Sequence, residues 1–103
     1  MLIRLTGKTE LVRSGTWDVP ETAGVYLIHD LRGTLYVGKS INLRKRFEQH
    51  LEKSHNFSLR KAIFNPIGEL TFSWIVSSEI DHLEKTLVHY LNPICNEIKY
   101  KSS

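Results

Sequence analysis

Two tyrosines and the cations near them are the first residues of this 103-residue chain whose types and spacing suggest chemistry. Tyr26 and Tyr36 lie in two short apolar runs, "GVYLIHD" and "TLYVGK", and Lys39 and Arg46 follow closely. Because nearby cations favour the charged form of a phenol, they would lower its pKa from the usual value of about 10. A tyrosinate formed in this way is a credible general base. The alternative is a pair of strand tyrosines that only packs.

Glu84 is the most informative acidic residue. Its helical neighbours at minus four, plus three and plus four are Ile80, Leu87 and Val88, so its carboxylate lies beside the apolar face of a helix. A carboxylate drawn toward a core is unfavourable unless it is hydrogen-bonded, paired or bound to a metal. Glu84 is therefore a metal ligand, a surface residue slightly displaced by helix curvature, or a residue satisfied by a backbone group or an arginine.

Several other polar residues have both a structural and a functional explanation. His50 and His55 flank the end of a basic helix and are either surface residues or groups that take part in catalysis or phosphate binding. Asn96 follows Pro93, where an asparagine is typical of a turn that bonds its own backbone. The residues that form either a solvated basic surface or a set of phosphate contacts are Arg44, Lys45, Arg60 and Lys61.

The elements that must position these groups begin with a hairpin. "GVYLIHD" and "TLYVGK" alternate with period two around "LRG", which predicts two antiparallel strands. In the register that keeps the apolar residues together, Tyr26 and Tyr36 share one face. The other face then carries Val25, Leu27, Leu35 and Val37.

A basic helix is predicted next, from Asn42 to about Lys53, with Ser40 as its N-cap. Its apolar stripe consists of Leu43, Phe47 and Leu51, and a basic edge beside that stripe consists of Arg46, His50 and Lys53.

The remaining sequence predicts two more helices and a third main strand. "FSLRKAIF" indicates a short helix, "ELTFSWIVS" a strand, and "EIDHLEKTLVHYLN" a helix that ends before Pro93. Residues 1–15 predict two weak strands, "LIRL" and "ELVR", around a "TGKT" turn, and "SGTWDVPETAG" is expected to be irregular.

Length and composition limit the class of protein. With 41% hydrophobic and 24% charged residues, the 103-residue chain is expected to fold as one α+β domain. Its net charge of +3 permits a polyanionic partner. The single Cys95 cannot form an internal disulfide, and no Cys/His set has the spacing of a structural zinc site. Without a signal peptide or an apolar run of about 18 residues, we expect a cytoplasmic protein with no membrane association.

With these residues in view, the sequence resembles the GIY-YIG nuclease family over about residues 22–98. "GVY" at 24–26 and "YVG" at 36–38 correspond to the two halves of the family name, with valine in place of isoleucine. The family's arginine lies eight residues after the second glycine, and counting from Gly38 this is Arg46. Its glutamate lies on a later helix, where Glu84 stands, and an asparagine about a dozen residues further on corresponds to Asn96. Residues 1–16 would be an N-terminal extension of the single domain.

The resemblance implies a fold and a reaction. The fold would be a small, mainly antiparallel three-stranded sheet flanked by helices, and the reaction would be hydrolysis of phosphodiester bonds in DNA. Glu84 would hold a single divalent ion, Mg²⁺ or Mn²⁺. Arg46 would bind the scissile phosphate, because its planar guanidinium matches two oxygens. Asn96, together with Gly38, would support the site.

The resemblance also implies how the attacking water is activated. Tyr26 would activate the water with help from Lys39 or His50, and Tyr36 would position water or phosphate. His50 and His55 resemble histidines that some homing-type members carry. Non-specific phosphate contacts would come from Lys39, Arg44, Lys45, Lys53, Arg60 and Lys61.

The residues do not indicate a source of cut-site specificity within the chain. Members that cut at defined sites usually have an appended DNA-binding domain or large insertions, for which this chain has no room. We therefore expect weak binding by the chain alone, action on a DNA structure, a homodimer, or a separate specificity partner, and RNA stays open as a substrate. The alternative function is a nucleic-acid-binding or protein-interaction module with the same fold and little or no cleavage. A third reading is a small α+β domain whose basic surface is only solvated.

Overall fold

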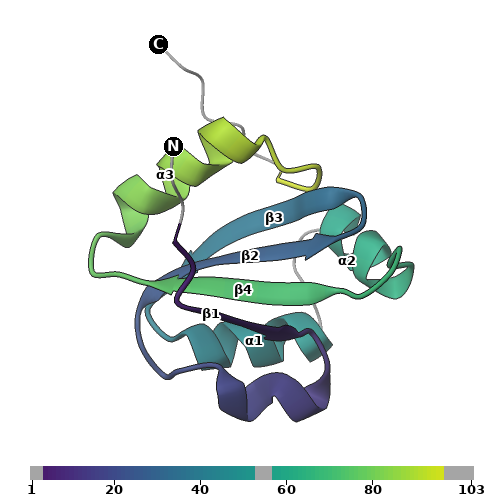
Figure 1. Ribbon diagram of the computed structural model, residues 1–103, viewed down its shortest axis with the longest axis horizontal. Coiled ribbons are helices and arrows are strands. Elements are labelled where there is room, and N and C mark those ends of the chain that lie inside the picture. The colour runs from purple at the N-terminus through teal and green to yellow at the C-terminus, as the bar shows by residue number, and fades with distance from the viewer. Residues whose placement is uncertain (1–3, 53–56, 97–103) are drawn as a thin grey trace.

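The computed structural model describes residues 4–52 and 57–96, which form one antiparallel sheet with helices on both faces (Figure 1). Its strands pair in the order β1-β4-β2-β3 and are β1 (Gly7–Glu10), β2 (Gly24–Asp30), β3 (Gly33–Ser40) and β4 (Thr71–Val76). The helices are the 3₁₀ helix η1 (Arg13–Asp18), α1 (Leu43–Glu52), α2 (Phe57–Phe64) and α3 (Ile80–Leu91). The expected α+β class is confirmed, as are the expected positions of β4, α2 and α3. No helix in the described ranges is long and apolar enough to cross a membrane.

The sheet has a fourth strand within residues 1–15, where the sequence predicts weak strands at other positions. β1 has the sequence GKTE and pairs with β4 from Gly7 opposite Trp74 to Glu10 opposite Thr71, so the predicted "TGKT" turn is wrong. The predicted strand "ELVR" is also wrong, because β1 ends at its first residue and η1 begins at Arg13. A short polar strand shows little apolar alternation, and it forms here because β4 offers it a row of backbone partners.

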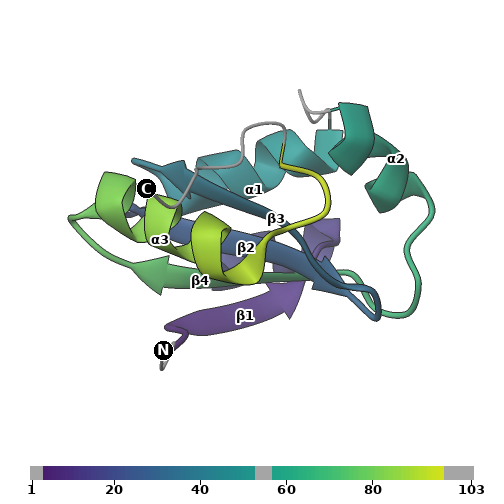
Figure 2. The same cartoon turned by 90° about the horizontal axis from the view of Figure 1, so that it is seen from above.

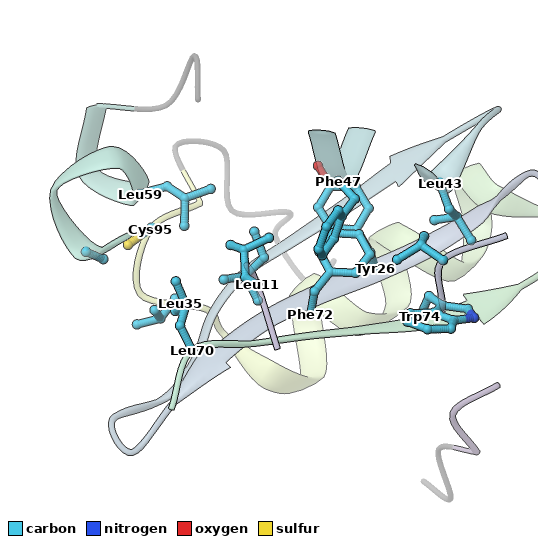
Figure 3. Packing of buried hydrophobic residues seen from close by; sticks show 13 residues of the cluster. Leu11, Tyr26, Leu35, Leu43, Phe47, Leu59, Leu70, Phe72, Trp74 and Cys95 are labelled. Carbon is cyan, nitrogen blue, oxygen red and sulfur yellow. The ribbon is translucent and has the colours of Figure 1, made fainter. Parts of the chain in front are cut away.

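Helices α1 and α2 lie on one side of the sheet, and α3 lies on the other (Figure 2). In the larger core, on the α1 side, the ring of Phe72 stacks on Tyr26 at 4.9 Å and meets Phe47 edge-on at 5.0 Å (Figure 3). The smaller core, on the α3 side, is built from Val25, Leu27, Val37, Leu87 and Val88.

The hairpin of β2 and β3 has the predicted register over most of its length, so Tyr26 and Tyr36 lie on the α1 side. A register shift between Ile28 and His29 leaves Leu35 without an opposing residue in the ladder. A bulge of this kind interrupts the alternation of faces. Leu35 therefore packs in the larger core, and the prediction that it shares a face with Val25, Leu27 and Val37 is wrong.

Helix α1 has Asn42, not Ser40, as its N-cap. The Asn42 Oδ1 accepts a hydrogen bond of 3.0 Å from the backbone N–H of Lys45, which is the contact expected of an N-cap. Ser40 acts one step earlier: its Oγ donates to the Asn42 carbonyl at 2.7 Å and accepts from the Asn42 N–H at 3.0 Å. The two residues together fix the turn by which β3 leads into α1.

Candidate active site

The centre of the candidate site is a buried pair from β2 and α1. The Tyr26 hydroxyl lies 2.7 Å from His50 Nε2, and the two residues are only 1% and 7% exposed. The phenol donates this hydrogen bond when Nε2 carries no proton. Tyr36 completes the group from β3, with its ring centroid 6.1 Å from that of Tyr26 and 5.8 Å from that of His50. Two phenol rings and one imidazole ring therefore lie close together where β2, β3 and α1 meet.

Gly38 makes room for the Tyr26 side chain. The two residues are paired across β2 and β3. A Cβ atom at position 38 would overlap the hydroxyl and Cζ of Tyr26. The glycine of "YVG" is thus required by a close approach of the tyrosine ring to the β3 backbone.

The pKa of Tyr26 differs from the expectation. Burial raises the pKa of Tyr26 well above its usual value of 10, the nearby Tyr36 raises it further, and the Arg46 charge lowers it by less than burial raises it. The prediction that neighbouring cations bring this phenol into a useful range is therefore wrong, because loss of solvation outweighs the attraction of the cation. Tyr26 is a neutral phenol at neutral pH, and any basic role needs a proton acceptor beside it.

The two helpers predicted for Tyr26 have different contacts in the described residues. His50 is hydrogen-bonded to the Tyr26 hydroxyl. Lys39 pairs across the ladder with Val25, a residue of the α3-side core, and its Nζ forms an ion pair with Asp81 at the start of α3. The prediction that Lys39 assists Tyr26 is not supported by these contacts.

Opposite charges act on the Tyr26 phenol from the two helices that flank β3. Arg46 on α1 is half-buried and its charge lowers the pKa of Tyr26, whereas Glu84 on α3 is half-buried and its charge raises it. In residues 4–52 and 57–96 no three His, Cys, Asp or Glu side chains form a cluster able to enclose a metal ion. A lone carboxylate fits Mg²⁺, which keeps several waters and takes one or two protein carboxylates, better than it fits zinc.

Asn96 holds the outer edge of β3. Its Oδ1 accepts from the Val37 N–H at 3.0 Å, and its Nδ2 donates to the Val37 carbonyl at 2.9 Å. The preceding Cys95 N–H donates to the Leu35 carbonyl at 2.7 Å, so the segment after α3 runs along β3. Asn96 therefore fixes the β3 backbone between Tyr36 and Gly38. Its amide forms hydrogen bonds with β3, whereas the sequence predicted bonds within its own turn.

The predicted basic contacts fall into different environments. Arg44 is half-buried and contacts its own protein: its Nε donates to the Val19 carbonyl at 2.8 Å and its guanidinium lies 5.1 Å from the centroid of the exposed Trp17 ring. These contacts favour a structural role for Arg44, and its phosphate contact stays a prediction. Lys45 is exposed and lines a cleft with Arg46.

The other predicted contacts lie apart from this cleft or outside the described ranges. Arg60 and Lys61 are on α2, and Lys61 lines a second cleft with Arg32. Lys53 and His55 lie outside the described residues.

Sequence reasoning missed two residues beside Arg46. Ile41 and Gln49 line the same cleft, between the end of β3 and the exposed side of α1. The available signal was an isoleucine in a polar turn, next to a helix whose positions 42, 45, 46 and 49 share one face.

The sheet order, the hairpin tyrosines and the flanking arginine and glutamate together define a GIY-YIG domain. A family model described as the UvrC-like GIY-YIG domain matches residues 22–97, and the chain belongs to this family.

Relatives and solved structures agree with this assignment. The UvrABC system protein C of Rickettsia bellii is 33% identical over 99 residues, 93% of this chain and 15% of its own length. That of Fusobacterium nucleatum is 31% identical over 80% of this chain and 14% of its own length. The magnesium-bound N-terminal endonuclease domain of Thermotoga maritima UvrC is 24% identical, has a TM-score of 0.67, and is matched over 85% of this chain and 98% of its own. The chain thus spans about a seventh of these two curated relatives and nearly all of the solved domain.

Proposed function

We propose that this chain is a divalent-metal-dependent endonuclease that hydrolyses phosphodiester bonds in DNA. The observation that carries the proposal is the buried Tyr26–His50 hydrogen bond, placed beside Tyr36 and between the charges of Arg46 and Glu84. Membership of the UvrC-like GIY-YIG family supports the same reaction class.

Water activation is assigned to Tyr26 and His50 as a unit. Because the phenol is neutral, it takes a proton from the attacking water at Oη only as it gives its own proton to His50 Nε2. The water oxygen then forms the new bond to phosphorus while the bond to the leaving oxygen breaks. Tyr36 would orient the water or a phosphate oxygen, and its ring, close to those of both Tyr26 and His50, supports this role.

Residues of α1 and α3 would neutralise the negative charge of the phosphate. Arg46 would bind the scissile phosphate with its planar guanidinium. Glu84 would hold one Mg²⁺ or Mn²⁺ ion, which when bound supplies positive charge near the leaving oxygen. Asn96 is a positioning residue, because it contacts the β3 backbone between Tyr36 and Gly38.

We also propose a separate protein as the source of specificity. The two relatives described above are named as proteins of the UvrABC system, and this chain is similar to only 14–15% of their length. The comparisons give no support to the predicted homodimer or to an RNA substrate.

The direct test is cleavage of supercoiled plasmid and of branched or flapped DNA with Mg²⁺, Mn²⁺ or EDTA. We expect metal-dependent nicking by the wild type and its loss in Glu84→Gln and Arg46→Ala variants that remain folded by circular dichroism. Glu48→Gln, an exposed glutamate on α1, is the matched control and should cut normally. If the wild type binds DNA and never cuts, the enzyme proposal fails and the binding-module alternative replaces it.

A further inference from the structure

A cleft of 320 Å³ lies at the turn from β3 into α1 and includes Arg46 in its wall. Its volume is within the range of clefts that accept small ligands or ligand fragments, roughly 300–1,000 Å³. The residues that line it are Ser40, Ile41, Asn42, Lys45, Arg46 and Gln49. The cleft is therefore continuous with the proposed phosphate-binding residue, but Tyr26 and His50 are not part of it.

The start of α1 offers few backbone donors to an anion at this turn. The first backbone N–H groups of α1 are already used: that of Leu43 donates to the Thr22 carbonyl at 3.0 Å and that of Arg44 to the Pro20 carbonyl at 3.1 Å. The Lys45 N–H donates to the Asn42 side chain. The two cations that line the cleft, Lys45 and Arg46, are its charged donors for phosphate groups.

Ile41 stands in this basic cleft with 85% of its surface exposed, more than any other large apolar side chain in the described part of the chain. A single exposed apolar residue is common on protein surfaces. Here it lies beside a cation proposed to bind the scissile phosphate, so the base or sugar attached to that phosphate comes within its reach. Nucleic-acid-binding proteins use isoleucine and similar side chains to contact or separate stacked bases.

We propose that this cleft receives the nucleotide next to the scissile phosphate, with Ile41 packed against its base and Gln49 available to the base edge. The proposal rests on the proposed nuclease function and adds a determinant of where it cuts. A base that is unstacked or easily unstacked would enter the cleft most readily, because less stacking free energy is lost. The expected preference is therefore for DNA that is distorted or unpaired beside the cut.

The test uses DNA with 2-aminopurine on either side of the mapped cleavage position, bound to the non-cleaving Glu84→Gln protein. We expect a fluorescence increase for the label on one side of the cut only, and its loss in the Glu84→Gln/Ile41→Ser protein. Ile41→Ser should also weaken binding by roughly tenfold, the size expected for one lost apolar contact. Ile41→Leu should retain both properties. The matched control is Leu31→Ala, because Leu31 is 80% exposed at the hairpin tip, at the opposite end of β3.

The outcomes separate this proposal from the one on which it rests. If the wild type binds and cuts DNA while Ile41→Ser behaves as Leu31→Ala does in binding, fluorescence and cut-site preference, the cleft proposal is overturned and the nuclease assignment stands. If the wild type neither binds nor cuts, the nuclease assignment is overturned and the cleft proposal with it. Because Ile41 is so exposed, its substitution should leave the circular dichroism spectrum unchanged.

Discussion

The side-chain amide of Asn96 forms two hydrogen bonds with the backbone of Val37, although the residues are 59 positions apart in the chain. Val37 lies between Tyr36, whose ring contacts the Tyr26–His50 pair, and Gly38, which makes room for Tyr26. The Asn96 amide therefore joins the segment after α3 to β3, the strand that carries Tyr36 and Gly38.

Asn96→Ala should lower the free energy of unfolding and slow cleavage without abolishing its metal dependence. The substitution leaves the Val37 N–H and C=O without their partners, and such a loss costs about 1–3 kcal/mol. Urea denaturation measures the free energy of unfolding. Cleavage rates at several metal concentrations measure the effect on activity and on its metal dependence. Unchanged stability, or a complete loss of metal dependence in a folded variant, would show that Asn96 does not act through Val37.

Gly38→Ala should destabilise the protein and displace Tyr26. The added methyl group would overlap the Tyr26 hydroxyl and ring, and overpacking of this kind costs about 1–3 kcal/mol. Adding Tyr26→Phe should restore part of the stability, because the hydroxyl is removed, but should not restore cleavage. Thermal unfolding and cleavage assays on the single and double variants check both points. Equal stability of Gly38→Ala and wild type would contradict the packing argument.

Tyr26 and His50 should behave as one catalytic unit. Tyr26→Phe and His50→Gln should each lower the single-turnover rate by about 100-fold, because either change interrupts the same proton transfer. The double variant should be hardly slower than the single ones, since the second change removes nothing further. A double-mutant cycle of cleavage rates makes the measurement. Independent, multiplicative effects would mean that the hydrogen bond between them has no part in water activation.

Two consecutive cations should give opposite results. Arg44→Ala removes the hydrogen bond to Val19 and the contact with Trp17, so we expect a loss of about 1–2 kcal/mol in stability with little change in DNA binding. Lys45→Ala should leave stability unchanged, weaken binding, and reduce the slope of log K against log salt by about one unit. Denaturation curves and binding at several salt concentrations separate them. If Arg44→Ala reduced the slope of log K against log salt, Arg44 would be shown to contact phosphate.

Asp30 should contribute to the acid sensitivity of the fold. Its carboxylate accepts hydrogen bonds from the Arg32 side chain and from the backbone N–H groups of Arg32 and Ile67, which lower the pKa of Asp30 from 3.8 to about 2. A lowered pKa in the folded state means that this stabilisation is complete above pH 3.8 and is lost as pH falls toward 2.

Asp30→Asn tests this pH dependence. The variant should be less stable than the wild type at pH 7. The difference between their Tm values should narrow as the pH is lowered from 3.8 toward 2. Circular dichroism melts from pH 2 to 7 measure it. A difference that does not change with pH would rule out Asp30 as the source.

Much of the fold follows from local pattern. The alternation in "GVYLIHD" and "TLYVGK" determines a hairpin with both tyrosines on one face, and the spacing of Leu43 and Phe47 determines the face of α1 that is buried. Which strands pair with each other is harder to predict, because strands pair through backbone hydrogen bonds and the backbone is the same for every residue type except proline. β1 has a polar sequence and forms only because the edge of β4 is available, and the bulge at Leu35 is equally invisible in the alternation.

The residue types and the spacing of the motifs are enough to identify the family. The protonation state and the partners of those residues come from the tertiary structure. The fold buries Tyr26 and so raises its pKa, it places His50 against that phenol, and it bonds Arg44 to the Val19 carbonyl while Lys45 stays exposed. The physical reason is that solvation, ion pairing and hydrogen bonding depend on neighbours distant in the chain, whereas helical and strand periodicity depends on neighbours a few residues away.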